Sequence, residues 1–141
     1  MSWDVFVQDL PADVETLDEI PDDFRPAPLM ATAVLIERNK EVVPEADFGE
    51  QTWGQIEGPG FSIEVSICDR DPVQSFAFHV RGGDMAAGIV ADLLEHLGLR
   101  ALDPGSASGF FDRQSAFASL TAWRTYRDRV VGRDTEAPWA R

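Results

Sequence analysis

Alternating apolar and polar residues predict most of the strands of this protein. The clearest case is Phe61–Cys68, in which every second residue is apolar and the residues between are polar or small. A period of two is typical of a strand with one buried and one solvated face. The same period recurs in Trp3–Leu10 and Val73–Arg81, and shorter strands are expected at Trp53–Glu57 and Leu99–Leu102. Because short turns separate the strands between residues 53 and 81, we expect them to form an antiparallel meander.

Apolar residues at helical spacing predict three helices. The first is expected over Leu29–Val43, where Pro44 stops it. The second follows Asp84, which we expect to be its N-cap, and ends at Gly98. Its apolar stripe is the most continuous of the three and consists of Ala86, Ile89, Val90, Leu93, Leu94 and Leu97. The third is expected over Arg113–Val131, with a stripe made of Ala116, Leu120, Trp123 and Val130 that also includes Arg127.

These elements predict a single α+β domain over residues 1–131, followed by a C-terminal tail at 132–141. We expect an antiparallel sheet of about four to five strands, with two to three helices packed mainly on one face. A chain of 141 residues can bury a sizeable core without disulfide bonds. Residues 11–28 contain four prolines and many acids, so we expect a long connection there.

Composition narrows the classes of partner. The chain has 12 basic and 25 acidic residues, a formal net charge of −13, which disfavours nucleic acids and anionic membranes and permits a basic protein. The lone cysteine, Cys68, excludes an intrachain disulfide and fits a reducing compartment. The first residues lack a basic and apolar leader, and no apolar run approaches the ~20 residues of a membrane span. We therefore expect a cytoplasmic protein.

The charge is distributed unevenly. Residues 1–30 carry a net −7, whereas residues 112–141 carry a net +2. Trp123, Arg124 and Arg127 lie on the third predicted helix, and arginine and tryptophan are enriched at interface anchors. We predict that these three residues meet the acidic N-terminal segment. The contact would lie within a monomer or between the two copies of a homodimer.

The turn between the third long strand and the second helix contains two glycines. Because the chain must reverse within two residues, we expect either Gly82 or Gly83 to have a positive φ. A helix N-terminus beside glycines and Arg81 can bind a carboxylate or phosphate. No GxGxxG pattern or Walker lysine accompanies the turn, and Asp84 would repel an anion. An ordinary structural turn is therefore the favoured interpretation, and an anion site is the alternative.

A polar patch is expected on the solvated face of the sheet. Simple hairpin register would set Ser66 near Ser75 and Glu64 near Ala77, with His79 diagonal to Glu64. Glu64, His79 and Arg81 would then form one polar patch beside Gly82 and Gly83, which Glu57 could extend. A Glu–His pair can relay a proton, but an exposed cross-strand pair is the commoner arrangement.

Metal and thiol chemistry have weaker support. Asp92 and His96 lie four residues apart on the second predicted helix, as metal ligands can, but no third ligand has suitable spacing. Cys68 has no sequence signature of a catalytic thiol around it. We therefore predict no metal, no cofactor and no catalytic residue.

Several short strings carry a resemblance to known sequences. They are WDVFVQDLP (3–11), IPDDF (20–24), ADF (46–48), GFSIEV (60–65), HVRGG (79–83) and LGLRALD (97–103). In these strings the chain resembles a family of small acidic bacterial proteins of unassigned function. The resemblance covers residues 2–103 and implies no catalytic residues.

The leading functional hypothesis is a non-enzymatic cytoplasmic binding protein that uses an acidic surface. One version is an immunity-type or regulatory protein that neutralises a basic partner, because opposite charge accelerates association. The alternative is a small-molecule or anion-binding domain, or a minor enzyme, with its site at His79, Arg81, Gly82, Gly83 and Glu64.

Overall fold

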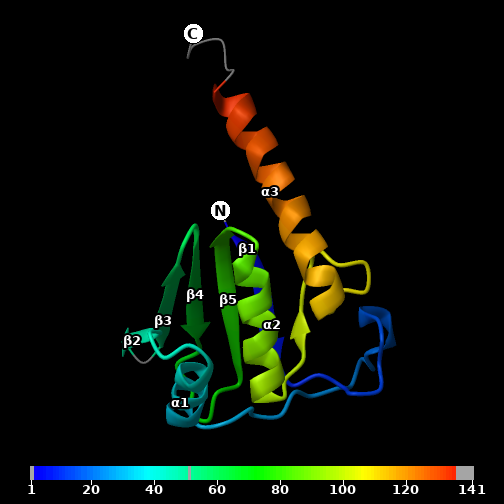
Figure 1. Cartoon of the computed structure of the whole chain (residues 1–141). Helices are drawn as coiled ribbons and strands as arrows, with labels where there is room; N and C mark the ends of the chain where they lie inside the picture. Colours follow the sequence, from blue (N-terminus) through cyan, green and yellow to red (C-terminus); the bar gives the residue numbers. More distant parts are fainter. Residues whose placement is uncertain (1, 51, 136–141) are drawn as a thin grey trace.

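A six-stranded antiparallel sheet forms the centre of the molecule (Figure 1). The computed structural model describes residues 2–50 and 52–135. The strand order is β2-β3-β4-β5-β1-β6, so the N-terminal strand pairs with β5 rather than with its neighbour in sequence. The strands are β1 (Trp3–Gln8), β2 (Asp47–Glu50), β3 (Trp53–Gly58), β4 (Phe61–Ile67), β5 (Ser75–Gly82) and β6 (Ala101–Leu102).

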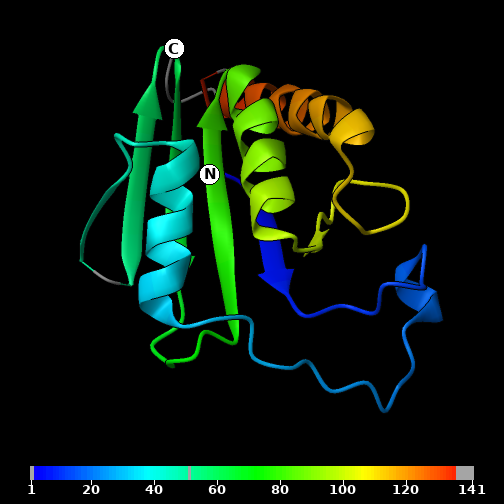
Figure 2. The ribbon, with the colours of Figure 1, turned by 60° about the horizontal axis from the view of Figure 1, so that its bottom comes forward.

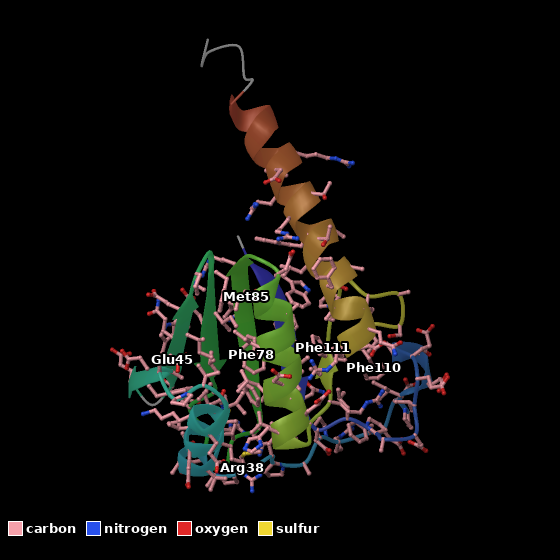
Figure 3. The ribbon with its side chains drawn as sticks, viewed as in Figure 1. Arg38, Glu45, Phe78, Met85, Phe110 and Phe111 are labelled. Carbon is pink, nitrogen blue, oxygen red and sulfur yellow. The ribbon has the colours of Figure 1, made fainter. Side chains whose placement is uncertain are left out.

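The helices are α1 (Thr32–Val42), α2 (Met85–Leu97) and α3 (Arg113–Thr135), with a short 3-10 helix η1 (Leu17–Glu19). Helices α1 and α2 lie against the same face of the sheet, and α3 packs beside α2 (Figures 1 and 2). The predicted α+β class, with an antiparallel sheet and helices on one face, is confirmed. The strand that was not predicted is β2, because its two acids and its glycine leave no alternation of apolar and polar residues.

The core lies between the sheet and α2. Fully buried side chains alternate along the strands and include Val5, Ile63, Val65, Phe78 and Val80. Val90 and Leu93 face them from α2, where both are completely buried, as the predicted stripe required. Gly98 ends α2 in the left-handed conformation, and the Leu99 N–H bonds to the carbonyl of Leu94.

Helix α1 begins at Thr32, three residues later than predicted. Ala31 occupies the N-cap position, and the Thr32 N–H donates instead to the carboxylate of Asp71 at 3.0 Å. Leu35 and Asn39 are buried on its inner face, and the Asn39 amide donates to the Leu35 carbonyl at 2.8 Å. A residue of the β4–β5 turn thus satisfies a helix end that has no local cap.

The acidic connection over residues 9–28 packs against the loop before α3. Leu10, Val14 and Phe110 form a small second core, and the guanidinium of Arg100 lies 4.1 Å from the centre of the Phe110 ring. The Leu17 N–H donates to the carbonyl of Ser108 at 3.2 Å. These contacts hold the segment beside the base of α3 (Figure 2).

Helix α3 is longer than predicted and extends past the end of the sheet (Figure 1). The tail expected at 132–141 therefore begins inside the helix, and residues 136–141 lie outside the described residues. Arg124 pairs with Asp84 at 2.5 Å, and Arg127 pairs with its neighbour Asp128 at 3.0 Å. These two arginines therefore pair with acids outside the connection at residues 11–28, which lies at the base of α3, whereas Trp123 shares a groove with Asp4 of the N-terminal segment. The predicted contact between two molecules stays a prediction.

Candidate protein-binding surface

The sheet face opposite α1 and α2 carries a polar row that crosses five strands. Strand pairing aligns Asp47 with Gln55, Gln55 with Glu64, Glu64 with His79, and His79 with Asp4. Paired residues project from the same side of a sheet, so these five side chains lie on one face. We call this face, with its side chains from β1 to β5, the open face.

His79 lies at the centre of the open face. Its Nδ1 atom is 2.8 Å from Oδ1 of Asp4, and its ring stacks on Trp53 with centroids 6.3 Å apart and planes inclined by 23°. The side chain of Glu64, on the other flanking strand, accepts a hydrogen bond from Arg81 at 3.0 Å. The imidazole is thus fixed between an acid and an aromatic ring.

An aromatic row runs beside the polar row. Pairing aligns Trp53 with Ser66, Ser66 with Ala77, and Ala77 with Phe6. Trp53 is 42% exposed and Phe6 is 41% exposed, although both belong to strands of the central sheet. Large exposed rings on a regular sheet face are typical of a surface that another molecule covers.

A small acidic groove continues the open face at its β2 edge. Glu45, Asp47, Gln55 and Glu57 line this groove, whose volume is about 210 Å³. The Gln55 amide donates to Glu57 at 2.8 Å, and Asp47 accepts from the Gly49 N–H at 2.9 Å. The three carboxylates and the amide oxygen are suited to an ammonium or guanidinium group.

The strand register corrects the predicted patch. Glu64 lies directly opposite His79, and Ser66 lies opposite Ala77, so the predicted hairpin register is wrong by two residues. Glu64, His79 and Arg81 do share the open face, as predicted. Sequence reasoning missed Asp4 and Trp53, which contact His79 from β1 and β3. The alternation in each strand indicates which face Asp4 and Trp53 occupy, but only the order of the strands in the sheet places them beside His79.

The Gly82-Gly83 turn has the predicted backbone conformation, but it presents few free hydrogen-bond donors to an anion. Gly82 has a φ of +97°, which confirms the expected positive φ. The Gly83 N–H donates to the Gly60 carbonyl at 2.9 Å, and Arg81 is held by Glu64. Asp84 occupies the N-cap position of α2, as predicted, but its side chain makes no capping hydrogen bond, because its carboxylate turns to Arg124. Arg81 and the Gly83 N–H are thus engaged within the protein, and a carboxylate stands at the start of α2.

The remaining candidates for chemistry lie apart from one another. His96 contacts Glu41 at 3.1 Å, while Asp92 pairs with Arg113 at 2.7 Å. Within residues 2–50 and 52–135, no group of three or more histidine, cysteine or acidic side chains is arranged to hold a metal ion. Two opposing effects act on the pKa of the Cys68 thiol: burial raises it, and hydrogen bonds with the backbone of Ser75, Arg70 and Gln74 lower it. The hydrogen bonds together outweigh burial, so the pKa lies below its usual value. Cys68 lies at the edge of the open face.

The comparisons with known proteins identify no relative. No family model, no curated protein and no solved structure matches the chain. The family resemblance of the short strings stays a prediction. Among the described helices, none combines the length and the apolar character needed to cross a membrane.

Proposed function

We propose that this protein is a non-enzymatic cytoplasmic binding protein whose open face receives a basic partner protein. The single observation that supports the proposal is the juxtaposition of an acidic row and an aromatic row on the open face. Asp4, Asp47 and Glu64 lie in the first row, and Trp53 and Phe6 lie in the second.

The balance of charges on the open face favours a cationic partner. Arg81 offsets only Glu64, and the nearby groove adds Glu45 and Glu57. A partner segment that alternates arginine or lysine with apolar residues would place its cations on the polar row and its apolar side chains on the rings. An immunity-type or regulatory protein that neutralises a basic partner is one specific form of this function.

The anion-binding alternative has less support. Arg81 and the Gly83 N–H that it requires have partners within the protein, and Asp84 places a carboxylate at the helix terminus, where it would repel an anion. A proton relay at His79 would need a substrate cleft, whereas the ring lies under Trp53 on a sheet face. We therefore propose binding rather than catalysis.

Two charge-matched variants test this proposal. Asp47→Lys with Glu57→Lys changes the open face, and Glu37→Lys with Asp13→Lys makes the same change of net charge at exposed positions away from the open face. Each variant, and the wild type, is used to capture proteins from the native host, and the captured proteins are identified by mass spectrometry. We expect a basic protein that binds the wild type and the second variant but not the first.

The affinity of the captured protein completes the test. Each exposed ion pair contributes about 0.2–1 kcal/mol, so reversing two charges should weaken binding by about tenfold or more. Trp53→Ala should weaken it further through the lost apolar contact. Equal weakening by both charge variants would show that net charge alone drives binding, and it would refute the assignment to the open face.

A further inference from the structure

The outer half of α3 has few packing partners in the molecule. Ala116, Ser119 and Leu120 are buried near the start of the helix, whereas Tyr126, two turns later, is 59% exposed. Figure 1 shows the helix continuing beyond the end of the sheet. Isolated helical segments of this length are marginal in water, so stable helix here requires a surface to pack against.

A groove lies beside this unpartnered segment. It has a volume of about 500 Å³ and is mainly apolar. One wall comes from Asp4 and Phe6 of β1, and the other comes from Ala122, Trp123 and Tyr126 of α3. The three α3 residues are spaced as i, i+1 and i+4, so they form one side of the helix. An apolar helix side next to an apolar groove is a surface that a second helix can fill.

The charge of α3 identifies the occupant. Its outer half, residues 124–135, holds four arginines and two acids, a net +2, whereas residues 1–123 hold seven basic and 22 acidic residues, a net −15. Arg127 lies 5.1 Å from the centre of the Trp123 ring, so a cation borders the groove on the α3 side. Asp4 borders it on the β1 side. The mainly apolar groove therefore carries Asp4, which contacts His79, in its β1 wall, and Arg127, which pairs with Asp128, lies behind Trp123 of its α3 wall. An acid on one side and a cation on the other are complementary to the same groups of a second copy.

We propose that the groove and the outer half of α3 form the interface of a two-fold symmetric homodimer. The two α3 helices run antiparallel, and Tyr126 of each copy enters the groove of the other copy. This arrangement sets Arg127 of one copy near Asp4 of the other, which is the self-complementarity that a two-fold interface requires. With 23 residues, α3 is about 34 Å long, sufficient for an extended helix–helix contact.

Within the acidic N-terminal segment, this dimer uses Asp4 and Phe6 of β1 rather than the connection at residues 11–28. It covers Asp4 and Phe6 at the β1 end of the open face and leaves the β2 and β3 side accessible. Trp53, Asp47 and Glu57 lie on that side, two strands or more from β1. Dimerisation and binding of a basic partner can therefore be disrupted separately.

Sedimentation velocity of the full chain from ~1 to ~200 µM tests the proposal. The monomer mass is 15.6 kDa, and we expect a species of twice that mass to dominate at the upper concentrations. Tyr126→Glu and Ala122→Glu each place a charge in the groove and should weaken association by at least about 100-fold. Phe117→Glu is the matched control, because Phe117 is 53% exposed and lies on the opposite side of α3 from Tyr126.

Thermal unfolding of each variant verifies that it is folded, and the two groove variants act as checks on each other. Hydrogen exchange adds a local readout, since amides of residues 124–130 should exchange more slowly at ~200 µM than at ~1 µM. A wild type that stays monomeric at ~200 µM would overturn the proposal. A dimer that survives both groove variants, or that Phe117→Glu abolishes, would overturn it as well. Loss of partner capture by the open-face variant with an intact dimer would leave the two proposals independent.

Discussion

Gly82 offers the sharpest test of the backbone geometry that joins the sheet to α2. It ends β5 opposite Phe61 and has a φ of +97°. A Cβ atom at this position would lie 2.2 Å from the carbonyl oxygen of Gly60 and 2.7 Å from Cα of Phe61. Both atoms belong to the backbone, so neither can rotate away. Replacement by alanine must therefore displace the β4 hairpin end or the start of α2.

The cost of Gly82→Ala has two parts. Placing an L-residue at positive φ costs about 1–2 kcal/mol. Relieving an overpacked contact typically costs about 1–3 kcal/mol more. We therefore expect Gly82→Ala to lower the free energy of unfolding by about 2–5 kcal/mol, a large share of the stability of a domain of this size.

Alanine substitutions at three other glycines distinguish the cost of positive φ from the cost of the steric contact. Gly60 also has a positive φ, of +76°, but among the described residues nothing lies within 4 Å of a Cβ placed there, so Gly60→Ala should cost only about 1–2 kcal/mol. At Gly83 the nearest atom is 3.5 Å away, and alanine should change stability by less than about 1 kcal/mol. At Gly88 in α2, no atom of the described part of the chain lies within 4 Å of an added Cβ, so alanine should stabilise the protein by about 0.5–1 kcal/mol.

Urea unfolding followed by tryptophan fluorescence measures all four variants under the same conditions. Comparable slopes with urea would show that the midpoints reflect stability alone. If Gly82→Ala cost no more than Gly60→Ala, the close approach to the Gly60 carbonyl would not contribute, and the reasoning from steric contact would be refuted.

The remaining predictions concern the core, the β1–loop contact and the thiol. Leu93→Ala should cost about 2–5 kcal/mol because the side chain is fully buried, whereas Met85→Ala, at a position 62% exposed, should stay within about 0.5 kcal/mol in the same urea assay. Trp3→Phe should cost about 1–3 kcal/mol, since it removes the 3.0 Å hydrogen bond to buried Asp103; an unchanged midpoint would contradict this. The fold lowers the pKa of Cys68, which raises the fraction of thiolate at a given pH. Alkylation by iodoacetamide should therefore reach half its maximal rate at a lower pH in the folded chain than in the urea-unfolded chain. Equal midpoints in the two states would contradict the shift.

Features that depend on neighbouring residues in the chain were predictable. The apolar stripe of α2 and its glycine stop are local, and the helix ends at the expected residue. The alternation in β4 correctly separates its buried and open faces. The positive φ at the double glycine was also predictable, because the chain must turn there whatever packs around it.

Features that depend on residues far apart in the chain could not be predicted from the sequence. Asp84 was correctly placed at the N-cap of α2, but its carboxylate pairs with Arg124, 40 residues later, instead of capping the helix. The hairpin register was misassigned because the β4–β5 turn is longer than a simple hairpin allows, and a shift of two residues preserves the same alternation. A periodic pattern shows which face a residue occupies, but it does not show which residue lies opposite.

The sequence by itself determined the fold class, the buried faces and the acidic character of the molecule, because each follows from composition or from local periodicity. Only the tertiary structure decided that β1 lies between β5 and β6. That strand order brings Asp4 to His79 across 75 positions of sequence and sets Phe6 beside the groove at α3. Pairing between strands far apart in the chain is selected by the packing of the whole core rather than by either strand alone, so both candidate surfaces emerge only when the sheet is assembled.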